Sequence, residues 1–208
     1  MRRLLILAGL VVLAVVWAGP LLAAWRGSFS AHMVAHMGVV AVAAPLIAAG
    51  LSRADASAAP VSALSQGFLP VAAALLEFIV VWGWHAPAMR AMAEASLAVT
   101  AIEQLMFLAC GLVLWTSALR PGNETAGAIG LLLTSMHMTL LGALLALSPR
   151  PLYGLSDVTC FGLTLPAGLD QQIGGVVMLA VGAAVYLAGG VFLVARMLNR
   201  EPDAEVVR

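Results

Sequence analysis

Long apolar runs separated by short polar breaks dominate the sequence. The breaks contain arginine or proline, as at Arg26, Pro87 and Pro149, and such residues tend to end apolar helices. A helix of about 20 residues crosses about 30 Å of hydrocarbon, and six windows of this length fit between the breaks. The pattern predicts membrane-spanning helices at residues 4–24, 29–50, 63–84, 97–119, 125–147 and 168–197. The chain is therefore predicted to be an all-α integral membrane protein, with one transmembrane helical domain over residues 1–208.

Composition and charge support a membrane protein and exclude several other classes. The chain is 62% hydrophobic and 10% charged, with a mean hydropathy of +1.03, which is far from the composition of a soluble domain. The formal net charge is zero and the basic residues are scattered, so the chain offers no positive face for nucleic acid. The expected environment is the lipid bilayer. Cys110 and Cys160 form no CxxC motif and no disulfide framework.

The first apolar run and the arginine distribution predict the orientation. The run is longer than the roughly 7–15 residues of a signal-peptide core, so we expect this segment to be retained as a span. Arginine is enriched in cytoplasmic loops. A cytoplasmic N-terminus places these arginines inside: Arg2, Arg3, Arg53, Arg120, Arg196, Arg200 and Arg208. It places only Arg26, Arg90 and Arg150 outside, and an even number of spans then puts both termini in the cytoplasm.

Four ionisable residues lie more than one turn inside the predicted spans, at similar depths in the outer half or near the midplane. They are His36, Glu77, Glu103 and His137, on four different spans. Placing an ionisable group at the bilayer centre costs about 2.5 kcal/mol or more, so four such groups are unlikely to face lipid separately. We expect them to converge in one polar network. The outer end of the last span adds Asp170, Gln171 and Gln172 as supporting polar groups.

The second span begins with two His-Met pairs. His32 and His36 are four residues apart, which places both rings on one helix face about 6 Å apart along the axis. Met33 and Met37 occupy the adjacent flank, and His85 lies at the same outer end on the third span. Imidazole and thioether ligands suit copper, and the thioether favours Cu(I). Paired histidines also occur without a metal, and buried methionine is common in ordinary packing.

These ligand types predict a copper site near the outer surface. Three imidazoles would bind one ion, with one thioether completing the set: His32, His36 and His85, with Met33 or Met37. His137 lies one or two turns deeper and is a candidate for a second metal site or for the carboxylate network.

Five short motifs, in order, resemble the CtaG family of cytochrome c oxidase assembly factors. They are "HMVAHM", "WHAP", "IEQLMFLACGLVLW", "LGALLALSPRPLY" and "DQQIGGVVM". The resemblance implies a multi-pass protein of the bacterial plasma (inner) membrane that helps to supply copper to the oxidase and is not an enzyme. The family positions matched are His32, His36, His85, Asp170, Gln171, Gln172, Gly174 and Gly175. Where the family commonly has Glu-His on the fourth span, this chain has Glu103-Gln104, which shifts the predicted role to Glu103.

Three functions remain open at this stage. The first is an assembly factor and metallochaperone that binds copper at its outer face, with oxidase subunits or a periplasmic copper carrier as partners. The second is a b-type haem protein with His36 and His137 as axial ligands. The third is a proton-coupled metal transporter in which Glu77 and Glu103 relay protons. A homo-oligomer is compatible with each of them.

Overall fold

The computed structural model describes residues 1–52, 63–160 and 162–199, and it confirms six helices long and apolar enough to span a membrane. The first is α1 (Arg2–Ala18) continued by α2 (Pro20–Ala23). The second combines α3 (Phe29–Met37), η1 (Gly38–Ala43) and α4 (Ala44–Leu51). The others are α5 (Ala63–Trp84), α7 (Leu97–Ala118), α8 (Glu124–Leu147) and α9 (Ala167–Leu198). Arg53, Arg200 and Arg208, used to predict the orientation, lie outside the described residues.

The connections contain structure that the hydropathy pattern did not predict. Helix α6 (Pro87–Ala95) lies between α5 and α7. An antiparallel hairpin of β1 (Val158–Cys160) and β2 (Leu163–Leu165) precedes α9 in the connection between the last two spans, while the spans themselves are all helical, as predicted. Gly162, with a φ of 78°, lies in the connection between the strands, where glycine adopts the left-handed backbone without steric cost.

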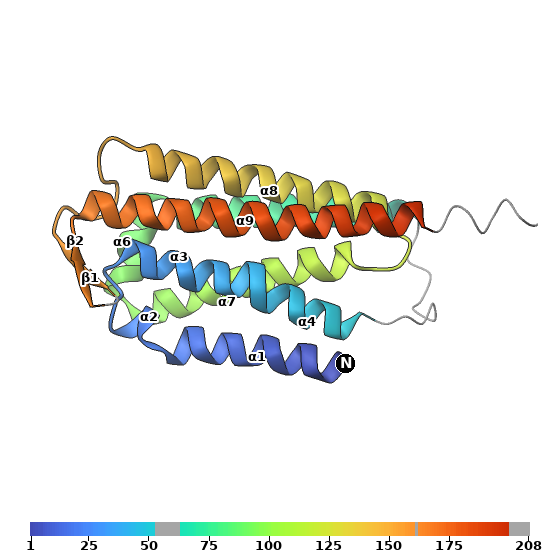
Figure 1. Ribbon diagram of the computed structural model, residues 1–208, viewed down its shortest axis with the longest axis horizontal. Coiled ribbons are helices and arrows are strands. Elements are labelled where there is room, and N and C mark those ends of the chain that lie inside the picture. Colours follow the sequence, from blue (N-terminus) through green and yellow to red (C-terminus); the bar gives the residue numbers. More distant parts are fainter. Residues whose placement is uncertain (53–62, 161, 200–208) are drawn as a thin grey trace, which may run out of the picture.

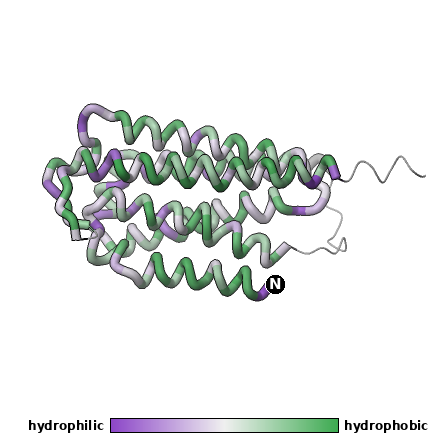
Figure 2. The backbone as a smooth tube through the Cα atoms, in the orientation of Figure 1, coloured by the Kyte–Doolittle hydropathy of each residue, from purple (hydrophilic) through white to green (hydrophobic). Residues whose placement is uncertain are grey.

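The long helices run side by side as a bundle, with the hairpin and α6 at one end (Figure 1). We call this end the hairpin end. The N-terminus and the last residues of α9 lie at the opposite end, as six spans require. Hydrophilic residues gather mainly at the two ends, while apolar residues follow the lengths of the helices (Figure 2). Which end faces the cytoplasm stays a prediction.

Helices α8 and α9 approach closely at two glycines. A Cβ atom on Gly142 would lie 2.8 Å from the Gly175 carbonyl oxygen, and one on Gly175 would lie 2.7 Å from the Gly142 carbonyl oxygen. Without side chains at these positions the two backbones meet directly, as is common where membrane helices pack. This contact fixes α9 beside α8 and so places the first turn of α9 at the hairpin end.

A π-helical turn interrupts the second span ahead of Pro45. The Ala44 N–H donates to the Val39 carbonyl oxygen, and Pro45 has no N–H for the Val40 carbonyl oxygen. Two side chains from other helices contact that oxygen instead: Trp115 Nε1 at 3.1 Å and the Tyr186 hydroxyl at 3.4 Å. The kinked span is therefore tied to α7 and α9 at mid-depth.

Candidate functional site

Three buried imidazoles meet near the hairpin end of the bundle. His32 and His36 come from α3, and His85 follows the last residue of α5. The ring centroids are 5.5 Å apart for His32–His85, 5.3 Å for His36–His85 and 6.4 Å for His32–His36. We call these three residues the histidine triangle. Phe107 of α7 packs on it, with its ring centroid 4.2 Å from that of His36.

At least one nitrogen of each ring in the triangle lacks a hydrogen-bond partner within the described residues. The Nε2 atoms of His32, His36 and His85 are all buried and unpaired, which is costly for polar atoms away from water. Metal–imidazole bonds of about 2.0 Å place the ring centroids of neighbouring ligands about 5 Å apart. Two sides of the triangle are close to that spacing, whereas the His32–His36 side is wider. Within the described ranges no three His, Cys, Asp or Glu side chains already form a closed metal site, so the rings must converge to bind an ion.

His85 is held in the form that binds metals. Its Nδ1 atom lies 2.6 Å from the Val81 carbonyl oxygen, so Nδ1 carries the hydrogen and donates it. The lone pair is then on Nε2. Burial lowers the pKa of the His85 imidazole to about 4, so the ring is neutral near pH 7. A neutral imidazole with a free Nε2 lone pair is the state that a metal ion requires.

Arg90 of α6 reaches the triangle from outside. Its side chain is only 3% exposed, and Nη1 lies 3.2 Å from His32 Nδ1, while Nη2 donates to the Arg26 carbonyl oxygen at 2.9 Å. Its Nε atom pairs with the Glu94 carboxylate at 3.1 Å. Burial lowers the pKa of the Arg90 guanidinium, and the nearby carboxylates of Glu103 and Glu94 oppose that shift. A guanidinium nevertheless keeps its charge in proteins.

Glu103 and Arg90 favour opposite tautomers of His32. The guanidinium can only donate, so its contact makes His32 Nδ1 the acceptor and leaves the hydrogen on Nε2. Glu103 Oε2, 3.7 Å from the same Nδ1 atom, can only accept when ionised and favours a hydrogen on Nδ1. Only the second arrangement frees Nε2 of His32 for a metal. Whether His32 Nδ1 contacts Arg90 or Glu103 therefore decides whether Nε2 of His32 can bind a metal.

Asp170 fixes the start of the helix that carries two of the three imidazoles. Its carboxylate accepts from the Phe29 N–H at 2.6 Å, the Ser30 N–H at 3.3 Å, and the Ser28 and Ser30 hydroxyls at 2.9 and 2.5 Å. Ser28 also accepts from the Ala31 N–H as the N-cap of α3. A carboxylate here satisfies backbone N–H groups at the positive end of the helix.

A comparison with known protein families gives a match over nearly the whole chain. The sequence model of the family "cytochrome c oxidase caa3 assembly factor" matches residues 1–200. The chain belongs to this family. The resemblance seen in the five sequence motifs is therefore confirmed. No curated protein and no solved structure matches the chain.

Met33 and Met37, the two predicted thioether ligands of this assembly factor, lie on a different flank of α3 from the imidazoles. Met33 and Met37 are buried, but they pack toward α9. A Cβ atom on Gly174 would lie 3.0 Å from Met33 Cγ, and one on Gly182 would lie 3.6 Å from Met37 Cε. The absence of side chains at these two glycines makes room for the thioethers. Their part as copper ligands stays a prediction.

The two buried glutamates belong to different groups of contacts. Glu103 lies beside His32 and Arg90, whereas Glu77 accepts from the Tyr186 hydroxyl at 3.0 Å, next to the π-helical turn. Similar depth therefore did not mean direct contact, and no hydrogen bond or ion pair found within the described residues joins Glu77 to an imidazole. Tyr186 and Trp115 were not among the predicted site residues. Trp115 Nε1 and the Tyr186 hydroxyl contact the Val40 carbonyl oxygen, for which Pro45 has no backbone N–H.

His137 of α8 makes no ring contact with the histidine triangle within the described residues, although it is close enough to His36 for the two imidazoles to interact electrostatically. Its ring packs edge-on against Phe78 of α5 at a centroid distance of 5.4 Å, whereas the nearest ring to His36 is that of Phe107 at 4.2 Å. The two imidazoles thus pack on different phenylalanines from different helices. No observation favours them as an axial pair for haem.

The remaining predicted polar residues, Gln171 and Gln172, lie in the first turns of α9. Gln171 donates to the Leu145 carbonyl oxygen at 3.1 Å and accepts from the Leu152 N–H at 2.6 Å, so it ties the α8–α9 connection to α9. Gln172 is exposed. Tyr153, which the sequence analysis did not select, donates to the His85 carbonyl oxygen at 2.6 Å and stacks on Phe29.

The buried arginine could have been found from sequence. Arg90 and Glu94 are four residues apart in "PAMRAMAEA", the spacing of an ion pair on a helix. Met89, Met92 and Ala93 recur at spacings of three and four residues, which indicates an amphipathic helix. Counting Arg90 only as a marker of membrane orientation hid this signal.

Proposed function

We propose that this assembly factor binds Cu(I) as cargo in the histidine triangle and supplies it to a subunit of the caa3-type oxidase. The observation that carries the proposal is the set of three buried, unpaired Nε2 atoms on His32, His36 and His85. Soft to borderline nitrogen ligands suit copper, and a thioether of Met33 or Met37 would extend the set if it turned from α9. The family is one of assembly factors and not a known enzyme family, and the proposed role needs no turnover chemistry.

The position of the triangle suits transfer between proteins. It lies near the hairpin end, which we infer is the outer face of the bacterial plasma membrane from the arginine distribution. A metal-binding domain of an oxidase subunit or of a periplasmic copper carrier could approach there. Binding requires His32 to exchange the Arg90 contact for the Glu103 contact, so displacement of Arg90 accompanies loading.

Replacing Glu103 by glutamine is expected to weaken Cu(I) binding by about 10- to 100-fold, the usual cost of losing the partner that orients a histidine ligand. The amide no longer offers the carboxylate that holds the hydrogen on His32 Nδ1. Competition titration of the purified protein with a chromogenic Cu(I) chelator measures the affinity. The matched control is Glu94→Gln, because Glu94 also pairs with Arg90 but has no contact with an imidazole among the described interactions. Equal affinities for Glu103→Gln and the wild type would contradict this role.

The predicted orientation is tested by cysteine labelling in whole cells. Ala88 in α6 and Pro121 at the opposite end are both exposed, whereas the native Cys110 and Cys160 are buried. An impermeant maleimide is expected to label the Ala88→Cys variant in intact cells and the Pro121→Cys variant only after lysis. The reverse pattern would place the histidine triangle on the cytoplasmic side.

A further inference from the structure

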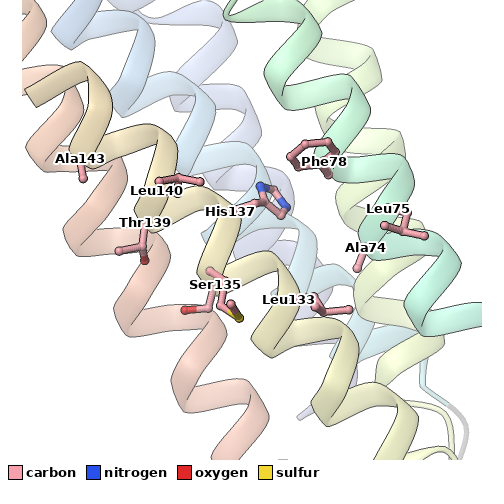
Figure 3. Close-up of a pocket in the computed structure, with 10 residues that line it drawn as sticks. Ala74, Leu75, Phe78, Leu133, Ser135, His137, Thr139, Leu140 and Ala143 are labelled. Atoms are coloured by element: carbon pink, nitrogen blue, oxygen red, sulfur yellow. The ribbon is translucent and has the colours of Figure 1, made fainter. Parts of the chain in front are cut away.

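A large apolar groove lies between α5 and α8, and none of its lining residues belongs to the histidine triangle. Its volume is about 820 Å³, within the usual range for small-molecule sites. Six of the residues that line it are Ala74, Phe78, His137, Thr139, Leu140 and Ala143 (Figure 3). Leu75 and Met136, also in the lining, are 53% and 69% exposed, so the groove opens on the apolar surface of the bundle. In a membrane that surface faces lipid.

His137 is the feature of this groove that apolar packing does not explain. Its side chain is 9% exposed, and neither Nδ1 nor Nε2 has a hydrogen-bond partner. Figure 3 shows the ring between α8 and α5, next to Phe78. A polar group without a partner is unfavourable in hydrocarbon, and a hydrogen-bonding ligand would offset that cost.

The depth of His137 restricts which molecule can supply that partner. The residue lies 13 positions after the start of α8 and 10 before its end, which is about 20 Å and about 15 Å along the helix. Phospholipids carry their polar groups at the membrane interface, so only their acyl chains reach this depth. The ligand must carry a polar atom inside the hydrocarbon. Among the described residues that line the groove, none other than His137 is ionisable, which favours a neutral ligand.

We propose that this groove binds a lipid-soluble quinone. A ring carbonyl oxygen accepts the hydrogen of His137, and the quinone ring packs against Phe78, while an apolar tail follows Leu75 and Leu140 toward the surface. Aromatic packing and one buried hydrogen bond are the interactions that fix the orientation of small ligands in apolar sites. The lining of the groove contains none of the three triangle residues, and the inference does not rest on copper binding.

Binding of decylubiquinone to the purified protein in phosphatidylcholine nanodiscs tests this inference. Quinones quench tryptophan fluorescence, and Trp82 lies beside Phe78 at a centroid distance of 5.3 Å. We expect saturable quenching with the wild type, and a Kd about tenfold higher for His137→Leu, which loses one buried hydrogen bond. His137→Gln keeps an N–H donor and is expected to restore much of the affinity. Copper affinity is expected to stay at the wild-type level in both variants.

Three controls separate the quinone from other occupants. Ala143→Phe fills the groove while keeping His137, and it is expected to abolish saturable quenching even if His137→Leu fails to fold. Decylbenzene has the same chain length but no carbonyl, so equal competition by decylbenzene would show a groove for acyl chains and overturn the proposal. Equal Kd values for the wild type and His137→Leu would also overturn it. A wild-type dimer in native mass spectrometry that Ala143→Phe converts to a monomer would assign the groove to a second copy of the chain instead.

Discussion

Simultaneous replacement of His32, His36 and His85 by alanine is expected to weaken Cu(I) binding by more than about 100-fold, because removing ligands costs more than removing the groups that orient them. Oxidase activity in membranes is expected to fall with it, while the abundance of the assembly factor stays the same. The Nε2 atoms make no hydrogen bonds within the described structure, so the hydrogen bonds that the variant loses are those of His85 Nδ1 with the Val81 carbonyl oxygen and of His32 Nδ1 with Arg90. Metal analysis of the purified protein and immunoblotting of the same membranes measure the two quantities.

The matched control is His137→Ala, which removes a buried imidazole from the same bundle but outside the triangle. It is expected to keep the wild-type copper stoichiometry. Copper retained by the triple variant would refute the site. Loss of the protein itself in the triple variant would show that the imidazoles are structural, and single replacement of His36, which has no hydrogen bond through either nitrogen, would then test the site alone.

The apolar runs were sufficient to predict the spans because membrane thickness fixes helix length. The same reasoning predicted that His85 lies near His32 and His36. The second span begins, and the third span ends, on the same side of the bilayer. Hydropathy carries little information about the connections, which leave the hydrocarbon. Helix α6 and the hairpin were therefore missed, although an ion-pair spacing marked α6.

The depth of a residue along its span does not tell in which direction its side chain points from the helix axis. The buried glutamates show this. Glu77 and Glu103 were predicted to share one network, but Glu77 contacts Tyr186 and Glu103 lies next to His32 and Arg90. Met37 packs toward α9 for the same reason, since only the order of helices in the bundle decides which neighbour it faces. The order of the helices in the bundle cannot be deduced from a single sequence.

Asp170 illustrates how a residue identified by a motif acquires its physical role only in the fold. The sequence placed it at the start of the last span as a supporting polar group. The structure shows that it caps another helix, more than a hundred residues earlier in the chain, with four hydrogen bonds to residues 28–30. The close contact of Gly142 with Gly175 holds α9 against α8, and Gly174 makes room for Phe29 and Met33 of α3. The glycines after Asp170 thus help to place its carboxylate on the first turn of α3.

Replacing Asp170 by alanine is expected to lower the free energy of unfolding by about 3 kcal/mol or more, since several buried donors lose a charged acceptor at once. Asp170→Asn keeps one carbonyl acceptor and is expected to lose about half as much. Thermal unfolding in detergent measures both, and Gln172→Ala, on the same turn but exposed, is the matched control. Because His32 lies one turn after the capped residues, Cu(I) affinity is expected to fall in the same order as stability. An Asp170→Ala variant with wild-type stability and weakened copper binding would contradict the capping role and make Asp170 part of the metal site itself.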